Sequence, residues 1–591
     1  MSTTLLLAAL AFSAQDADTT VAGQGVAYRI EATLDESTDV LTGRARFEYT
    51  NNAAATLDTL WFHLHLNAFR PNSAWARRDL QFGNRRFTDL GPDEHAFERL
   101  RTVRVSDEEI TPFYPGAPDS TVVAIPLPEP LRSGESVTVL MDWDSRLSTL
   151  PRRQGRRERH YDFAQWYPRI AVYDADGWQV QPLMPQGEFY GEFAAYDVTL
   201  DVADDQVIGG TGVPVQGDPG WADARAAGSP EPRYQRDAYD VQPAVPLQLL
   251  EGDAADGRKR VRWVARDVHH FAWSTSPDYI YEGGQWNGVA IHVLYQPGDT
   301  AWAGGVVVRR TADALAFLQD VFGPYPWPQL TNLHRIEGGG TEFPMMVMDG
   351  SASEGLIMHE VAHQYVHGIL ANNEWREGWL DEGFASFLTS WYFEQRGEDV
   401  RQGWRSNLEQ IREMANAGAT QPIALASAEF RDFGTYNAMT YTKPALVLRM
   451  LRDLMGDTSF RDGMRRYYRD NRLSHVREGD LIAAMELAWG RDLDWFFEQW
   501  IHTTDTLDYA VGELRVTSQR EGVWTVEVEV LREGEIWMPV YLRVNGETRL
   551  LDSREARQVA TFTLRDRPDE ARLDPDEILL DVDPSNNSKR F

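Results

Sequence analysis

One short stretch constrains this chain more than any other. It is His359-Glu360-Val361-Ala362-His363, which is followed after eighteen further residues by Glu382 within a Trp-Leu-Asp-Glu-Gly segment. If residues 354–370 form a helix, the two histidines lie one turn apart on one face and can both reach a single metal ion. One helix face does not easily supply a third ligand, so we expect Glu382 to provide it from a second helix. Three protein ligands leave one position for water, which is typical of a catalytic rather than a structural zinc site.

The carboxylate between the two histidines completes this pattern. Glu360 is expected to point to the same side as the histidines, where it can take the proton of the water. The competing interpretation is a helix that carries two ordinary surface histidines, and the downstream glutamate in its own helix-like segment argues against it. The chain contains no cysteine, which excludes sulfur ligands, thiol catalysis and disulfides.

Beyond the pentapeptide, the whole segment HEVAHQYVHGILANNEWREGWLDEGFASF resembles the zinc aminopeptidases of the aminopeptidase N and leukotriene hydrolase family, within the gluzincins. Residues 339–343 lie where that family carries its G-x-M-E-N motif, and residues 441–445 resemble its Y-x-K-G segment. Residues 165–169, with the Tyr-Asp and Gly-Trp pairs that follow at 173–174 and 177–178, are similar to its bacterial, exported branch. The resemblance extends from about residue 25 to about residue 505.

The resemblance implies how a substrate would be held. Glu342 would bind the free α-amino group of a peptide, because an interior peptide offers no ammonium and would leave this acid unpaired. The backbone of Gly339 and Gly340 would pair with the substrate as an added strand, since glycine permits close approach. Gln165 is a second candidate for the amine, with an ordinary loop glutamine as the alternative.

The resemblance also implies a hydrogen-bond donor for the reacting carbonyl group. Tyr441 would donate to the oxygen that gains charge in the reaction, with Tyr436 as the nearest rival. Two departures from the family pattern stand out: Thr341 and Phe343 replace the Met and Asn that flank the glutamate, and Pro444 replaces a glycine. We expect the first departure to alter the pocket for the first side chain, and the second to be tolerated in a first helical turn.

Composition restricts the partners. The formal net charge of −32 argues against nucleic acid, because phosphate binding needs a basic face. The charge is most simply a solvated acidic surface, and the low lysine content fits either salt adaptation or a GC-rich genome. No apolar stretch is long enough to span a membrane. The sequence does not determine the oligomeric state, and a monomer is the default expectation.

The N-terminus predicts the compartment. Residues 5–12 are apolar and are followed by Ser13, Ala14 and an acidic stretch, which is typical of a signal peptide. The absence of Lys and Arg before residue 5 leaves a disordered or strand-like N-terminus as the alternative. With a signal peptide the protein would be periplasmic or secreted, and without one it would be cytoplasmic.

Hydrophobic periodicity divides the chain. Alternation of apolar and polar residues predicts strands before about residue 275 and again after about 504, with helical patterns between. Together with the resemblance, this predicts a multidomain α+β protein with an N-terminal antiparallel β domain, a thermolysin-like α/β catalytic domain and a small C-terminal β-sandwich. The expected parts are a signal peptide at 1–20 and domains at 21–277, 278–503 and 504–591.

These features predict a zinc-dependent aminopeptidase with one Zn²⁺ per chain, acting on peptides that have a free N-terminus. One alternative is a gluzincin that acts as an endopeptidase or on a non-peptide substrate. The other is a non-catalytic scaffold descended from the enzyme.

Overall fold

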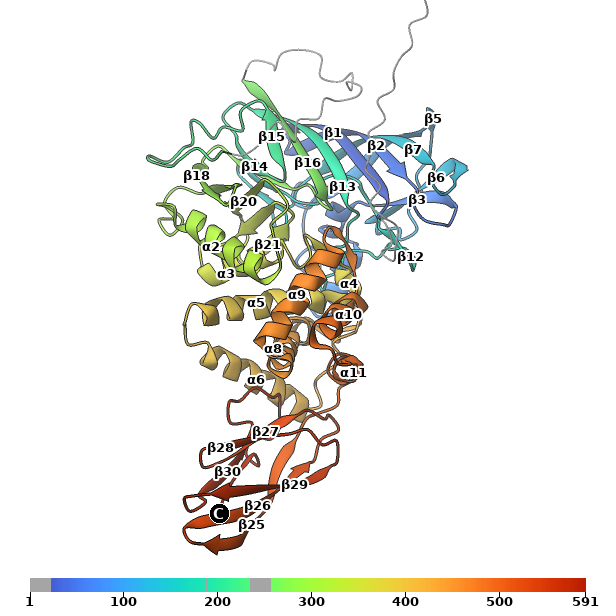
Figure 1. The fold of residues 1–591 in the computed structure, drawn as a ribbon. Coiled ribbons are helices and arrows are strands. Elements are labelled where there is room, and N and C mark those ends of the chain that lie inside the picture. Colours follow the sequence, from blue (N-terminus) through green and yellow to red (C-terminus); the bar gives the residue numbers. More distant parts are fainter. Residues whose placement is uncertain (1–22, 188, 234–256) are drawn as a thin grey trace, which may run out of the picture.

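The computed structural model describes residues 23–187, 189–233 and 257–591. Figure 1 shows three blocks stacked along one axis: a large β domain, a helix-rich middle part and a C-terminal β domain. This arrangement confirms the predicted α+β class with a β-rich N-terminal domain. The predicted signal peptide lies outside the described residues.

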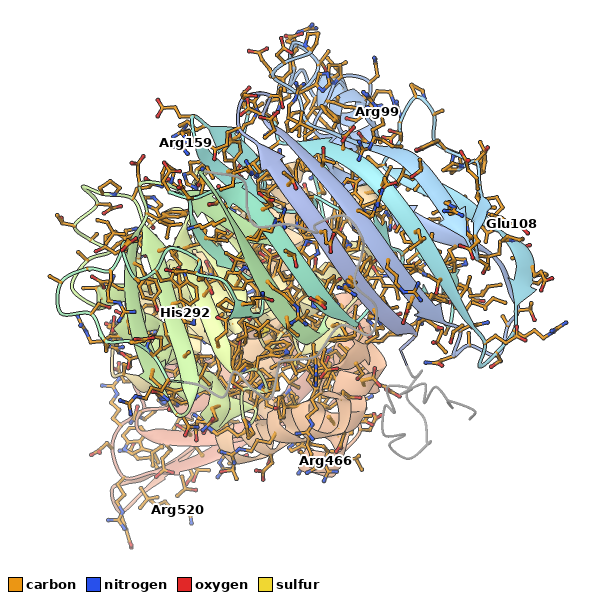
Figure 2. All side chains as sticks on the ribbon, turned by 90° about the horizontal axis from the view of Figure 1, so that it is seen from above. Arg99, Glu108, Arg159, His292, Arg466 and Arg520 are labelled. Atoms are coloured by element: carbon orange, nitrogen blue, oxygen red, sulfur yellow. The ribbon has the colours of Figure 1, made fainter. Side chains whose placement is uncertain are left out.

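The N-terminal domain is built on one large, mostly antiparallel sheet. Alternate residues of its strands are buried, as the periodicity predicts. The sole parallel neighbours in this sheet are β1 and β13. Viewed from above (Figure 2), its strands run side by side from the Glu108 end toward a second sheet that carries His292. The strand order is β15 (Val213–Gln216), β16 (Arg258–Val268), β13 (Ala194–Ala203), β1 (Gly25–Asp35), β2 (Val40–Thr50), β7 (Ser136–Arg146), β4 (Phe97–Val105) and β5 (Glu108–Glu109).

Smaller sheets of this domain hold the segment that leads into strand β21. The backbone N–H of Ile336 donates to Asp162 Oδ2 at 2.8 Å, and Thr211 Oγ1 donates to the carbonyl of Pro344 at 3.2 Å. The N-terminal domain therefore positions residues 336–344 from both ends. The sheets are β10 (Arg169–Ile170), β3 (Leu57–His63) and β6 (Val122–Leu131); β14 (Val207–Gly210), β17 (Trp273–Ser276), β9 (His160–Phe163) and β8 (Gly155–Arg157); and β11 (Tyr173–Asp174) with β12 (Gly177–Trp178).

The middle part of the chain begins with a five-stranded sheet whose edge strand is β21. Helix α2 (Val306–Val321) packs on β18 and β19, and helix α3 (Glu354–Ala362) packs on β21 and β22. Because β21 pairs only with β22 within this sheet, its other edge is available for an added strand. The order is β18 (Ile280–Trp286), β19 (Val289–Tyr295), β20 (Gln329–His334), β22 (Met346–Asp349) and β21 (Gly340–Phe343).

Helix α3 is shorter than the sequence predicts. It ends at Ala362 with His363 as its C-cap, rather than continuing to residue 370. The chain turns at His367, whose φ of 119° lies in the left-handed region, and then enters β23 (Leu370–Asn372). Strand β23 pairs in parallel with β24 (Ser474–Val476). The prediction of a helix to residue 370 was wrong because this long-range strand pairing ends it.

Helices complete the middle part of the chain. Helix α5 (Glu382–Gln395) contacts both α3 and α8 (Lys443–Met455), and a π-helical turn at Ala438–Thr442 leads directly into α8. The remaining helices are α4 (Glu374–Glu377), α6 (Arg401–Asn416), α7 (Phe433–Asn437), α9 (Asp457–Asn471), α10 (Glu478–Trp489) and α11 (Asp494–Ile501). Among the described residues, no helix combines the length and apolar character needed to cross a bilayer.

Two facing sheets form the C-terminal domain. Its buried valines alternate along β26 and β27, and the predicted hairpin at Asn545-Gly546 joins β27 to β28. This domain fits the expected small β-sandwich. One sheet contains β25 (Tyr509–Arg520), β26 (Val523–Arg532) and β29 (Arg557–Leu564); the other contains β28 (Glu547–Leu551), β27 (Val540–Val544), β30 (Glu570–Leu573) and β31 (Ser588–Arg590).

Candidate active site

Three side chains converge between α3 and the start of α5. His359 Nε2 lies 3.1 Å and His363 Nε2 lies 3.3 Å from the same atom, Glu382 Oε2. His363 and Glu382 are buried, whereas the side chain of His359 is 21% exposed to solvent. One nitrogen of each histidine and one oxygen of Glu382 form a group within 4.8 Å of one another.

This donor set fits zinc. Ligand atoms about 2.0 Å from a tetrahedral ion lie about 3.3 Å from each other, which agrees with both contacts to Glu382. The surroundings also favour positive charge. Burial alone would lower the pKa of His363, but Asp381 and Glu382 hold that pKa well above its usual value. His359, His363 and Glu382 are therefore suited to hold one Zn²⁺ with a position left for water.

Asp381 is a neighbour of this site that sequence reasoning missed. Its Oδ1 accepts a hydrogen bond from His363 Nδ1, and both side chains are fully buried. Burial raises the pKa of Asp381 to about 7, and His363 opposes that rise. A carboxylate in this position fixes the ring orientation of a ligating histidine and so leaves Nε2 directed at the metal. The available signal was its position in the sequence, directly before Glu382.

Glu360 lies buried against the backbone of Gly340. A Cβ atom at Gly340 would be 2.0 Å from the Glu360 carboxyl carbon, so only glycine leaves room for this carboxylate. Burial and the nearby Glu342 raise the pKa of Glu360 well above its usual value. The preceding Gly339 has a φ of 75°, which also favours glycine.

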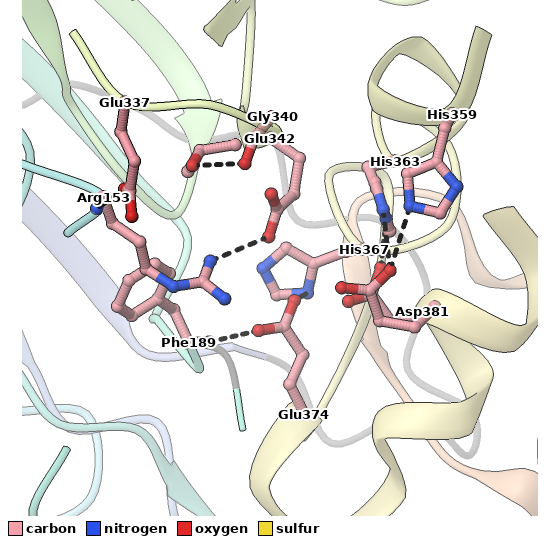
Figure 3. A network of polar contacts seen from close by, with 12 residues as sticks. Arg153, Phe189, Glu337, Gly340, Glu342, His359, His363, His367, Glu374 and Asp381 are labelled. Carbon is pink, nitrogen blue, oxygen red and sulfur yellow. Dashed lines mark hydrogen bonds and ion pairs between the residues drawn. The ribbon is translucent and has the colours of Figure 1, made fainter. Parts of the chain in front are cut away.

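Strand β21 places Glu342 beside the metal-ligand group, that is, His359, His363 and Glu382. Glu342 is buried, and its Oε1 lies 3.7 Å from Nη1 of Arg153 (Figure 3). The Arg153 guanidinium lies over the Phe189 ring, 5.2 Å from the ring centroid. The backbone N–H of Arg153 donates to Glu337 Oε2 at 2.8 Å, which ties this loop of the N-terminal domain to the segment before β21. No motif in the sequence indicated Arg153.

A second carboxylate, Glu374, faces the same space. His367 Nδ1 lies 2.6 Å from Glu374 Oε1, and Glu374 Oε2 accepts from the backbone N–H of Phe189 (Figure 3). One oxygen each from Glu342, Glu374 and Asp381 lie within 4.8 Å of one another, and all three residues are buried. Only 3% of His367 is exposed, because the turn after α3 folds this side chain inward.

Tyr441 projects from the π-helical turn toward the metal-ligand group. Its hydroxyl donates to Glu382 Oε1, and its ring lies parallel to that of His359 at 6.3 Å. A π-helical turn inserts one residue into a helix and often occurs at functional sites. Tyr436 lies nearby, with its ring 6.4 Å from that of Tyr441.

Gln165 is buried, with a φ of 59°. Among the described residues its side-chain amide makes no hydrogen bond, and in particular it makes none with Glu342 or the metal-ligand group. The structure therefore brings together His359, Glu360, His363, Glu382, Glu342 and Tyr441, and it leaves Gln165 unlinked to them.

Comparisons with known proteins agree with this geometry. Residues 345–500 match the Peptidase family M1 domain. The chain is 26% identical to the alanine/arginine aminopeptidase of Saccharomyces cerevisiae over 230 residues, which is 35% of this chain and 26% of that protein. It is 27% identical to aminopeptidase N of Streptomyces lividans over 153 residues, or 25% of this chain and 18% of that one. The matched part thus spans about a quarter or less of these curated relatives.

Solved structures extend the likeness of the fold. An M1 zinc metallopeptidase from Deinococcus radiodurans has a TM-score of 0.55 at 17% identity, with 81% of this chain and 94% of that chain covered. The aminopeptidase A of Legionella pneumophila, solved with aspartic acid, has a TM-score of 0.64 at 13% identity, covering 94% of this chain and 59% of that one. The fold around the site is therefore that of M1 peptidases.

Proposed function

We propose that this chain, a member of the M1 family of gluzincin peptidases, is a zinc-dependent aminopeptidase that releases the first residue of peptides. The observation that carries the proposal is the group His359, His363 and Glu382 next to Glu342 on the free edge of β21. The three-residue group supplies the metal ligands. Glu342 supplies a carboxylate at the end of the strand that a bound peptide would add to β21.

In this proposal, bound zinc supplies Lewis-acid activation of the water and of the scissile carbonyl. Glu360 takes a proton from the attacking water and passes it to the leaving amine. Tyr441 turns its hydroxyl from Glu382 to the substrate carbonyl oxygen, which it stabilises as charge develops there.

Glu342 makes the reaction specific for a free N-terminus. A peptide added along β21 would bring its α-ammonium to this buried carboxylate, with Glu374 close by to add negative charge. An N-acetylated or interior peptide would bring no ammonium to these carboxylates and would forgo that contact, which costs binding energy. Arg153 already contacts Glu342, so the incoming ammonium would share that carboxylate with a guanidinium.

Hydrolysis of aminoacyl amides and their N-acetylated counterparts tests the proposal, with zinc measured in the same samples. The wild type should cleave only the free-amine substrates. Glu342→Gln should raise KM by ~10-fold or more and keep zinc, because it loses a charge-assisted contact of about 2 kcal/mol. The matched control is Glu354→Gln on α3, whose carboxylate pairs with Arg396 outside the site.

The outcomes separate the alternatives. Equal cleavage of acetylated and free peptides would assign an endopeptidase role instead. Absence of zinc after equilibration with the metal would favour a non-catalytic scaffold.

Export belongs to the proposal as well. The apolar residues 5–12 support a cleaved signal peptide and a periplasmic or secreted enzyme. N-terminal sequencing of the protein made by its native host tests this: a mature chain that starts near residue 15 is expected, and an intact N-terminus would contradict export.

A further inference from the structure

A small pocket opens beside Glu342. Its volume is about 10 Å³, which is room for one water-sized group. Aromatic rings and proline close it, while imidazoles and the strand β21 supply its polar atoms. The lining residues are Phe189, His269, His270, Thr341, Glu342, Phe343, Pro344 and His367.

The hydrogen bonds of His270 define which group it presents. Arg169 Nη1 lies 2.6 Å from His270 Nδ1, and a guanidinium can only donate. His270 Nδ1 is therefore an acceptor, and the neutral ring carries its proton on Nε2. His270 is 1% exposed, and its Nε2 has no hydrogen-bond partner among the described residues. The ring thus brings an unused N–H donor to the pocket wall.

His269 offers the complementary group. Its ring is hydrogen-bonded to the backbone of His367, and its Nε2 has no partner within the described part of the chain. Burial lowers the pKa of both His269 and His270, and the nearby Arg169 lowers them further, so both rings are neutral. A neutral ring that donates through Nδ1 has Nε2 left as an acceptor.

Charge and size then restrict the ligand. An anionic group would approach Glu342 and Glu374, and a cationic group would approach the buried Arg169 guanidinium, so a neutral group is favoured. The available volume rejects branched and aromatic side chains. A hydroxyl group both donates and accepts, and it has the size of the water that this pocket would otherwise hold.

We propose that this pocket binds the first side chain of the substrate and selects a small hydroxyl-bearing residue, serine, through His270 Nε2–H. The inference rests on the proposed aminopeptidase function, because the α-amine and the first side chain leave the same Cα atom. A substrate whose ammonium binds Glu342 therefore carries its Cβ close to a residue that lines the pocket.

Matched substrates test the proposal on the wild-type enzyme. Seryl and 2-aminobutyryl p-nitroanilides differ only by a hydroxyl in place of a methyl group. We expect kcat/KM for the seryl substrate to be higher by roughly fivefold to tenfold, as for one neutral hydrogen bond, and leucyl to be slower than both. A 2-aminobutyryl or leucyl substrate that is cleaved as fast as the seryl one overturns the proposal.

Variants test the assignment to His270. Arg169 donates to both His270 Nδ1 and His65 Nε2, the latter at 3.0 Å, so His270→Leu and His65→Leu each remove one acceptor from Arg169. Of these two histidines, His270 alone lines the pocket. The ratio of kcat/KM for the seryl substrate to that for the 2-aminobutyryl substrate should fall to about one in His270→Leu. It should stay unchanged in His65→Leu. His270→Gln, whose amide can accept from Arg169 and donate into the pocket, should restore part of the preference for the seryl substrate. Equal loss in both leucine variants would assign the effect to Arg169 and overturn the role of His270.

A binding measurement separates this inference from the proposed function. Serinamide should raise the melting temperature of the zinc-loaded wild type more than 2-aminobutyramide does. If this difference appears without any hydrolysis, the pocket is specific and the peptidase function is wrong. If hydrolysis occurs and the two amides bind equally, the function stands and the pocket proposal is overturned.

Discussion

Two groups of histidines in this molecule have surroundings of opposite charge. In the first, carboxylates surround the ring of His363, and they raise its pKa despite burial. In the second, the rings of His65 and His270 accept hydrogen bonds from the buried guanidinium of Arg169, and burial together with Arg169 lowers their pKa.

The comparison shows that burial alone does not determine what a histidine does. Imidazoles that face carboxylates form a site for a cation, here the ligands suited to zinc. Imidazoles held by a guanidinium stay neutral, and they can only donate and accept hydrogen bonds. Under the two proposals, one residue type therefore serves metal binding in the first group and substrate contact in the second.

The largest expected effect follows from breaking the first group. His363→Gln should reduce zinc from one ion per chain to near zero and lower kcat/KM by at least ~10³-fold, because the activated water is lost. Metal analysis and amide hydrolysis measure this. The control is His475→Gln, which changes a half-buried ring that pairs with Glu192 and should leave the zinc in place. Full activity in the His363 variant would exclude the metal assignment.

Glu360→Gln sharpens the comparison within the same site. The amide keeps the shape but cannot accept the water proton, so kcat should fall by ~10³-fold while zinc remains. Stopped-time assays with metal quantification decide this. A variant that loses zinc as well would show that Glu360 acts on the metal site rather than on the proton.

Breaking the second group should affect stability first. Arg169→Met removes a buried donor that serves His65, His270 and the carbonyl of Tyr190. The orphaned acceptors should lower the free energy of unfolding by about 3 kcal/mol, with zinc retained. Urea denaturation measures this change. An equally stable variant would mean that the guanidinium does not hold the second group together.

Asp381→Asn tests how the first group is oriented. It replaces the carboxylate that accepts from His363 Nδ1 by an amide, which should weaken zinc affinity by roughly 10- to 100-fold. Competition with a chelator of known affinity measures the shift. Unchanged affinity would show that the backbone alone sets the His363 ring.

Lys443 gives a smaller effect that depends on pH. It is a buried cation that belongs to neither of the two histidine groups. Burial lowers its pKa to about 8, and Asp505 opposes this only partly. The unfolded chain holds this proton up to about pH 10.4, so stability should rise with pH between about 8 and 10.4. Lys443→Met should therefore increase the free energy of unfolding by about 2 kcal/mol at pH 7, with the gain fading toward pH 10.

Urea denaturation of wild type and Lys443→Met at pH 7, 9 and 10 checks that prediction. A difference that stays constant across this range would mean that Lys443 titrates normally in the folded protein.

The metal-ligand group could be predicted from the sequence because its geometry is local. His359 and His363 are one helical turn apart, and Glu382 opens the next long helix, so a short-range pattern carries all three residues. The same holds for the strand alternation of the outer domains. In each case, neighbours along the chain restrict the outcome.

Tertiary structure alone decided the rest. Arg169 meets His270 and His65 from positions 101 and 104 residues away, and Arg153 reaches Glu342 from another domain. No periodicity records such contacts, because they depend on how whole sheets pack. The early end of α3 has the same origin, since the pairing of β23 with β24 outweighs local helix preference. The sequence by itself thus determined the chemistry of the metal site, and the packing of distant segments determined what surrounds it.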